Sequence, residues 1–139
     1  MVVARWRQGK QIEVEVREHK VMIDQPRDMG GQDSGPTSTE FLAVSLAACS
    51  VHYALPFLER RGIPPKGLSV SARMVRADNP KRIGRIELVL TLPTAARGRL
   101  SDREKEGILR AAHTCYVQRT IVHQPEIAMQ VVEKESPGE

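Results

Sequence analysis

The chain has 139 residues, of which 40% are hydrophobic and 27% charged, as in a single soluble domain with an aliphatic core. The net charge of +4 comes from 21 basic and 17 acidic residues. The basic clusters alternate with apolar residues and lack an aromatic stacking set or helix-turn-helix spacing, so solvated charge is favoured over nucleic-acid binding, a weaker alternative. We expect one domain over residues 1–139, with a frayed tail from residue 133.

The longest stretch without Asp, Glu, Lys or Arg spans residues 41–58. It follows a glycine-rich turn and ends at Glu59-Arg60-Arg61-Gly62, which favours a buried helix over a membrane span. The first residues lack the apolar core and cleavage site of a signal peptide. Two cysteines are too few for a secreted disulfide scaffold. We therefore expect a cytoplasmic protein with no membrane partner.

The chain is predicted to open with three short strands, arranged as a meander. They are expected over residues 2–6, 12–16 and 20–24. Turns are expected at Gly9-Lys10 and Glu18-His19, and a loop dense in glycine, aspartate and serine follows over residues 26–36.

A long helix is predicted next, beginning at Thr37-Ser38-Thr39-Glu40. This is a capping box, in which the threonine hydroxyl accepts from the Glu40 amide and the Glu40 carboxylate reaches back to the cap. The helix is apolar on nearly every face from Phe41 to Phe57, which indicates central burial, and Gly62 is well placed to end it. So few flanking elements cannot cover such a helix in a monomer. We therefore expect an obligate homodimer that buries it.

The second half of the chain predicts a hairpin, a helix and a last strand. The hairpin strands are expected over residues 68–77 and 83–92. A second capping box, Ser101-Asp102-Arg103-Glu104, opens the helix. A further helical turn over 117–122 and a strand over 127–132 complete an α+β order of β-β-β-α-β-β-α-β.

The only two cysteines, Cys49 and Cys115, lie in the central helix and after the second helix. From the residues alone, each is either a packed apolar side chain or part of protected redox chemistry. His52 follows Cys49 by three residues and could polarise its thiol, although a structural hydrogen bond is favoured. Without Cys-x-x-Cys or His-x-x-x-His spacing or a phosphate-binding loop, we expect no metal and no cofactor.

Apolar and aromatic residues near Cys49 are expected to line one cavity with it, as core residues first and pocket residues second. They are Leu42, Leu46, Tyr53 and Phe57, with His52 beside them.

Two motifs, one around each cysteine, carry a family resemblance. The first runs Gly-Gly-Gln-Asp-Ser-Gly-Pro-Thr-Ser-Thr-Glu-Phe-Leu over residues 30–42, with Ala47-Ala48-Cys49 further on, and the second is Ala111-Ala112-His113-Thr114-Cys115-Tyr116-Val117-Gln118-Arg119-Thr120. Together they resemble the OsmC/Ohr family of osmotically inducible and organic hydroperoxide resistance proteins. The resemblance implies an OsmC-like fold and an intertwined homodimer with active sites at its interface.

The resemblance also implies a function for the two thiols. Cys49 would be the peroxidatic cysteine and Cys115 the resolving one in a peroxiredoxin-like cycle that reduces organic hydroperoxides and defends against oxidative stress. The implied reductant is a dithiol of the dihydrolipoamide type. Arg7 matches the activating arginine of the Ohr branch, and Arg27 lies closer to that of the OsmC branch. Either could hold Cys49 as a thiolate, or both could be solvated surface residues.

Two positions depart from the peroxidase branches of the family. Thr39 stands ten residues before Cys49, where those branches carry a glutamate, and Tyr116 replaces the typical proline after the second cysteine. These features place the chain nearer the less characterised OsmC-like branch. The alternative function is therefore a small-molecule-binding or redox-sensing protein without efficient peroxidase turnover.

Overall fold

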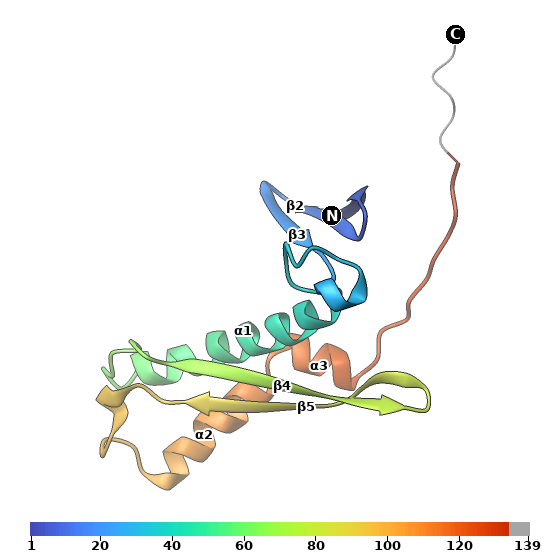
Figure 1. The fold of residues 1–139 in the computed structure, drawn as a ribbon. Coiled ribbons are helices and arrows are strands. Elements are labelled where there is room, and N and C mark those ends of the chain that lie inside the picture. The colour runs from blue at the N-terminus through green and yellow to red at the C-terminus, as the bar shows by residue number, and fades with distance from the viewer. Residues whose placement is uncertain (134–139) are drawn as a thin grey trace.

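The computed structural model describes residues 1–133 and has mixed α+β architecture (Figure 1). Its strands and α-helices are β1 (Val2–Gln8), β2 (Gln11–Val16), β3 (His19–Ile23), α1 (Ser38–Glu59), β4 (Ser69–Asp78), β5 (Lys81–Thr91), α2 (Asp102–His113) and α3 (Tyr116–Val122). Two short 3₁₀-helices, η1 (Arg27–Met29) and η2 (Thr94–Ala96), lie in the loops. The α+β class and the predicted order are confirmed as far as α3, which is the helical turn expected over 117–122.

The first three strands form an antiparallel sheet in the order β1-β2-β3. Arg5 on β1 forms an ion pair with Glu15 on β2, and Arg7 forms one with Glu13, so much of the charge on this sheet is paired. This sheet lies apart from the other elements, and the loop before α1 connects it to them (Figure 1).

Helix α1 begins at the predicted capping box. The Thr37 hydroxyl accepts from the Glu40 amide at 3.2 Å, and the Glu40 carboxylate accepts from the Thr37 amide at 2.7 Å. Only one side of the helix is buried within this chain, through Ala43, Leu46, Ser50, Ala54 and Leu58. On the other side Val44 is 49% exposed. By length and composition alone α1 could cross a membrane, a criterion that the core helices of soluble proteins also meet.

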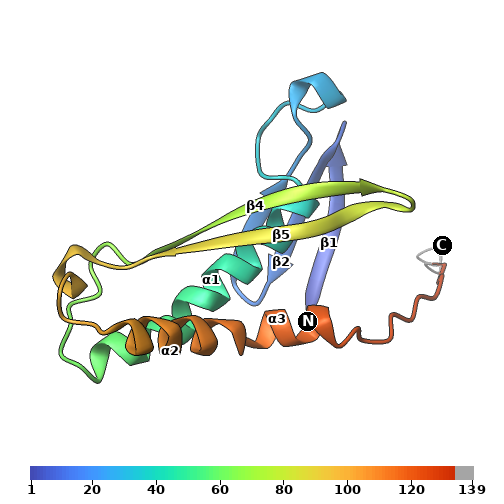
Figure 2. The ribbon, with the colours of Figure 1, turned by 90° about the horizontal axis from the view of Figure 1, so that it is seen from below.

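The core of the chain lies around the second half of α1. There the antiparallel hairpin β4–β5 packs on the helix through β4, and α2 and α3 both pack on it as well (Figure 2). The buried cluster consists of Ala54, Leu58, Ile63, Ala96, Leu100 and Ile108. Arg61, just after α1, donates to the Glu104 carboxylate at 2.9 Å, and this ion pair links the start of α2 to the end of α1.

The strand predicted over residues 127–132 is wrong for this chain. The segment after α3 contains no strand as far as residue 133, and it runs away from the body of the molecule (Figures 1 and 2). Ile127, Met129 and Val131 alternate as in a strand, but they are 85%, 92% and 93% exposed. The physical reason is that a strand needs a hydrogen-bonded neighbour, and this segment lies beside none. The predicted frayed tail lies, apart from residue 133, outside the described residues.

Candidate active site

The two cysteines meet where α1 passes the joint between α2 and α3. Cys49, in the middle of α1, is half-buried, whereas Cys115, between α2 and α3, is fully buried. The side chains of Cys49 and Ser50 lie close enough to the Cys115 thiol to change its pKa. Both cysteines are free thiols. The fold therefore brings together two thiols that lie far apart in the sequence.

The Cys115 thiol is held in its protonated form. Burial is the largest effect and raises the pKa of this thiol; the Gln118 amide, which donates to Cys115 Sγ at 3.3 Å, opposes it, and neighbouring Cys49 raises the pKa further. The net effect is a pKa above the ordinary cysteine value. Cys49 is half-buried whereas Cys115 is fully buried, so Cys49 is the more accessible of the two to a substrate.

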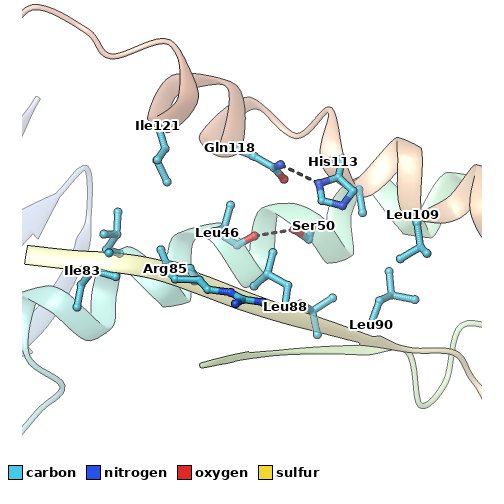
Figure 3. A pocket seen from close by; sticks show the side chains of 15 residues that line it. Leu46, Ser50, Ile83, Arg85, Leu88, Leu90, Leu109, His113, Gln118 and Ile121 are labelled. Carbon is cyan, nitrogen blue, oxygen red and sulfur yellow. Dashed lines mark hydrogen bonds between the residues drawn. The ribbon is translucent and has the colours of Figure 1, made fainter. Parts of the chain in front are cut away.

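The joint that carries Cys115 has its own hydrogen bonds. Cys115 is the N-cap of α3, since its sulfur accepts the Gln118 amide. The Gln118 side chain bridges back to α2, with its Nε2 atom 2.8 Å from His113 Nδ1 (Figure 3). Gln118 Oε1 is buried and has no hydrogen-bond partner among residues 1–133. Tyr116, which replaces the family's proline, is the first residue of α3 and is 72% exposed.

A cavity of about 380 Å³ adjoins this joint. It lies between α1, the β4–β5 hairpin and α2–α3, and its wall is mainly leucine and isoleucine, with Ser50, Arg85, His113 and Gln118 as polar members (Figure 3). The cysteines do not line the cavity, but their neighbours Ser50 and Gln118 do. The thiols therefore lie behind one wall of an apolar cavity.

The predicted pocket residues are divided between this cavity and other surroundings. Leu42 and Leu46 line the cavity, whereas His52, Tyr53 and Phe57 do not. His52 is exposed and Tyr53 half-buried. The Phe57 ring lies under the Arg61 guanidinium, 3.7 Å from ring centre to carbon, and packs near Gly107 of α2. Within residues 1–133, no three His, Cys, Asp or Glu side chains gather as metal ligands would.

The structure does not bring the two candidate arginines to the cysteines within this chain. The Arg7 guanidinium is bound to Glu13, and this bond holds the pKa of the Glu13 carboxyl below its usual value. Arg27 begins η1 and is exposed. Arg7 lies on β1 of the first sheet, and Arg27 lies in η1, in the loop between that sheet and the start of α1 (Figure 1).

Sequence reasoning missed Asp24, which organises the loop before α1. Its carboxylate is 1% exposed and accepts hydrogen bonds from the amides of Gln25, Gln32 and Ser34 and from the Ser34 hydroxyl, at 2.8–3.1 Å. Burial alone would raise the pKa of this carboxyl, but the four hydrogen bonds outweigh it and lower the pKa to about 2. The available signal was an acidic residue at a strand end, before a glycine-rich loop.

Two glycines let that loop lie directly on the end of the sheet. A Cβ atom at Gly31 would overlap the carbonyl of Gln25, and one at Gly35 would overlap the carbonyl of Met22. The glycines of the first motif are therefore explained by close backbone packing, which sets where α1 begins.

Thr39 lies in the first turn of α1, beside a second cavity of about 720 Å³ that also borders Arg76 and Arg82 of the hairpin. Ten residues of helix separate it from Cys49, a distance of about 15 Å along the axis. A side chain at position 39 is therefore too far away to contact the cysteine of its own chain.

The structure is that of an α+β protein in which two free thiols lie close together beside a central apolar helix. Residues 31–130, most of the chain, match the model of a family described as OsmC-like protein. The chain belongs to the OsmC-like family. No match was found among curated proteins.

Solved structures share this fold at low sequence identity. An osmotic stress induced and detoxification response protein from Psychrobacter arcticus is 20% identical, with a TM-score of 0.75 over 86% of this chain and 85% of that one. An OsmC-like protein from Mycoplasma pneumoniae is 18% identical, with a TM-score of 0.70 over 89% and 87%. The organic hydroperoxide resistance protein OhrB of Bacillus subtilis is 19% identical, with a TM-score of 0.57 over 86% and 88%.

Proposed function

We propose that this protein is a thiol-dependent peroxidase that reduces organic hydroperoxides in the cytoplasm. The observation that carries the proposal is the meeting of a half-buried thiol, Cys49, with a buried and protonated one, Cys115. The likeness to a protein named for organic hydroperoxide resistance supports it. The apolar surroundings of the site favour a substrate with a hydrocarbon group over hydrogen peroxide.

The chemistry needs only these two thiols, the hydroperoxide and a reductant. The Cys49 thiolate attacks the outer peroxide oxygen, an S–O bond forms, the O–O bond breaks, and the alkoxide takes a proton and leaves as the alcohol. Cys115 sulfur then attacks the sulfenic acid, so that an S–S bond forms and hydroxide leaves as water with the Cys115 proton. A dithiol of the dihydrolipoamide type reduces the disulfide by exchange.

The proposed active unit is an intertwined homodimer. Apolar surface on α1, including Val44, is exposed within one chain, as is the alternating apolar segment that contains Ile127. Within one chain, one side of α1 is uncovered, and the sheet β1–β3 lies apart from the helix (Figure 1). A second copy of the chain covers this apolar surface. It also brings to Cys49 side chains that are too far from it within one chain. In this arrangement Arg7 or Arg27 of one protomer approaches Cys49 of its partner and stabilises the thiolate.

A second candidate function is small-molecule binding or redox sensing without efficient turnover. Thr39 favours it, because it offers no carboxylate at the position where the peroxidase branches of the family carry a glutamate. Such a protein would form the disulfide once and return slowly to the dithiol.

Consumption of cumene hydroperoxide with dihydrolipoamide tests the proposal. Wild-type protein should turn over many equivalents, Cys49→Ser none, and Cys115→Ser should stop at a sulfenic acid that dimedone traps. Wild-type consumption no faster than that of Cys49→Ser would rule out the peroxidase. A single fast turnover followed by slow recovery would favour the sensor.

A further inference from the structure

We infer that Cys115 is a redox-dependent cap of α3, so that formation of the Cys49–Cys115 disulfide releases this helix and opens the site to the reductant. The inference rests on the disulfide of the proposed function. It goes beyond that function because it gives the resolving cysteine a second, conformational role.

The cap is visible in the geometry of the joint. Cys115 has the extended backbone of an N-cap, with φ −59° and ψ 146°, and its sulfur takes the place of the usual hydroxyl or carboxylate oxygen as acceptor for the Gln118 amide. The Cys115 carbonyl also accepts from the Arg119 amide at 3.0 Å. One residue therefore provides both the side-chain and the backbone acceptor for the first turn of α3.

Apart from the cap, α3 is held by its packing on α1 and by few other contacts. The helix has seven residues, from Tyr116 to Val122, and none of them is buried. Isolated helices this short are unstable in water, so their caps and tertiary contacts decide whether they form. Apart from the cap, the polar contact between α3 and α2 is the hydrogen bond between the side chains of Gln118 and His113. Gln118 and Ile121 are also where α3 forms part of the cavity wall (Figure 3).

Disulfide formation competes with the cap for the same sulfur atom. In the reduced protein the position of Cys115 Sγ is compatible with its contact to the Gln118 amide, whereas in the disulfide a covalent bond to Cys49 on α1 constrains the same sulfur. We expect the sulfur to move toward α1 and the Gln118 amide to lose its acceptor. The step is balanced without another oxidant, since sulfenic acid and thiol give disulfide and water.

Release of α3 would give a dithiol access to both sulfur atoms of the disulfide. Cys115 is 0% exposed in the reduced protein, so without movement of α3 an in-line approach is open only at the half-buried Cys49 sulfur. Loosening α3 uncovers the sulfur only after oxidation. In the reduced state the same helix shields the resolving thiol from other oxidants.

Hydrogen exchange measured by mass spectrometry tests the inference on the full chain. Reduced protein is compared with protein oxidised by diamide, a thiol oxidant that forms the disulfide without any peroxide. Peptides over 116–122 should exchange about fivefold faster after oxidation, the factor expected for loss of an N-cap. Peptides over 102–112 of α2 should not change, and neither should Cys49→Ser treated with diamide. Equal exchange over 116–122 in the two states would overturn the inference.

A matched pair of substitutions tests the cap in the reduced protein. Cys115→Ser keeps an acceptor at the N-cap and should exchange over 116–122 as the wild type does, whereas Cys115→Ala removes it and should resemble the oxidised protein. Equal exchange in the two variants would contradict a capping role. This comparison of hydrogen exchange does not require peroxide turnover. It therefore tests the capping role of Cys115 even if the protein is not a peroxidase.

Discussion

At the residue scale, the Asp24 carboxylate shows how one buried charge can determine where a helix starts. It gathers three amides and one hydroxyl of the loop that leads into α1. Sequence alone could not single it out, because an aspartate at a strand end is common and its partners are backbone groups. The cysteines differ, since recognisable motifs surround Cys49 and Cys115 and predicted them as a pair.

Replacing Asp24 by Asn should lower the melting temperature by several degrees at pH 7. The folded-state pKa is depressed from 3.8 to about 2, so the ionised carboxylate stabilises the fold above pH 3.8 and this contribution is lost as the pH falls toward 2. Asp24→Asn should also flatten the pH dependence of stability in that window, measured by circular dichroism during heating. Asp28→Asn, at an exposed position in η1, is the control. Equal melting curves for the two variants would contradict the role of Asp24.

Thr39→Glu should raise the rate of cumene hydroperoxide reduction by about a hundredfold, the lower end of the range for a positioned general acid or base. In the proposed dimer the carboxylate of one protomer would approach Cys49 of its partner and restore the group found at this position in the peroxidase branches of the family. Thr39→Gln has the same size without the charge and should stay at the wild-type rate. If both variants matched the wild type in steady-state assays, position 39 would have no part in catalysis.

At the element scale, the two capping boxes show that local chemistry can be predicted from sequence. Both helix starts lie where Thr37 and Ser101 were expected to cap them. The strand expected over 127–132 fails for the opposite reason. Alternation of apolar residues identifies which side chains share a face, but a strand forms only where another strand lies beside it.

Thr37→Ala should reduce the free energy of unfolding by about 1 kcal/mol, the usual cost of losing an N-cap. The Glu40 amide would lose its acceptor at the start of the longest helix. Urea denaturation followed by circular dichroism measures the loss. Ser38→Ala, one residue further on, removes a hydroxyl that caps nothing. A loss of stability no larger than that of Ser38→Ala would show that the box contributes little.

At the scale of the whole molecule, the sequence predicts that α1 is buried on nearly every face, and one chain buries only one side of it. The helix is apolar all round, but only one side is covered, and the first sheet stands off from it. Sequence patterns identify surface that must be buried without naming what buries it. For this reason the fold within one chain could be predicted more completely than the candidate site, whose arginine, Arg7 or Arg27, we propose to reach Cys49 across a dimer interface.

Val44→Glu should convert the proposed dimer into monomers, because it places a charge on the exposed apolar side of α1. Sedimentation equilibrium at low micromolar concentration gives the mass directly. Ala95→Glu introduces the same charge at an exposed residue of η2 and should remain dimeric. A folded wild-type monomer at this concentration, or an unchanged Val44→Glu dimer, would contradict the assembly.

The central claim is that Cys49 and Cys115 form one thiol cycle that acts on organic hydroperoxides. Intact-mass measurement with peptide mapping, after one equivalent of cumene hydroperoxide or of hydrogen peroxide, tests it most directly. We predict rapid formation of a Cys49–Cys115 disulfide, faster with the organic peroxide. Two unmodified thiols in folded protein would contradict the claim and make both cysteines packing residues.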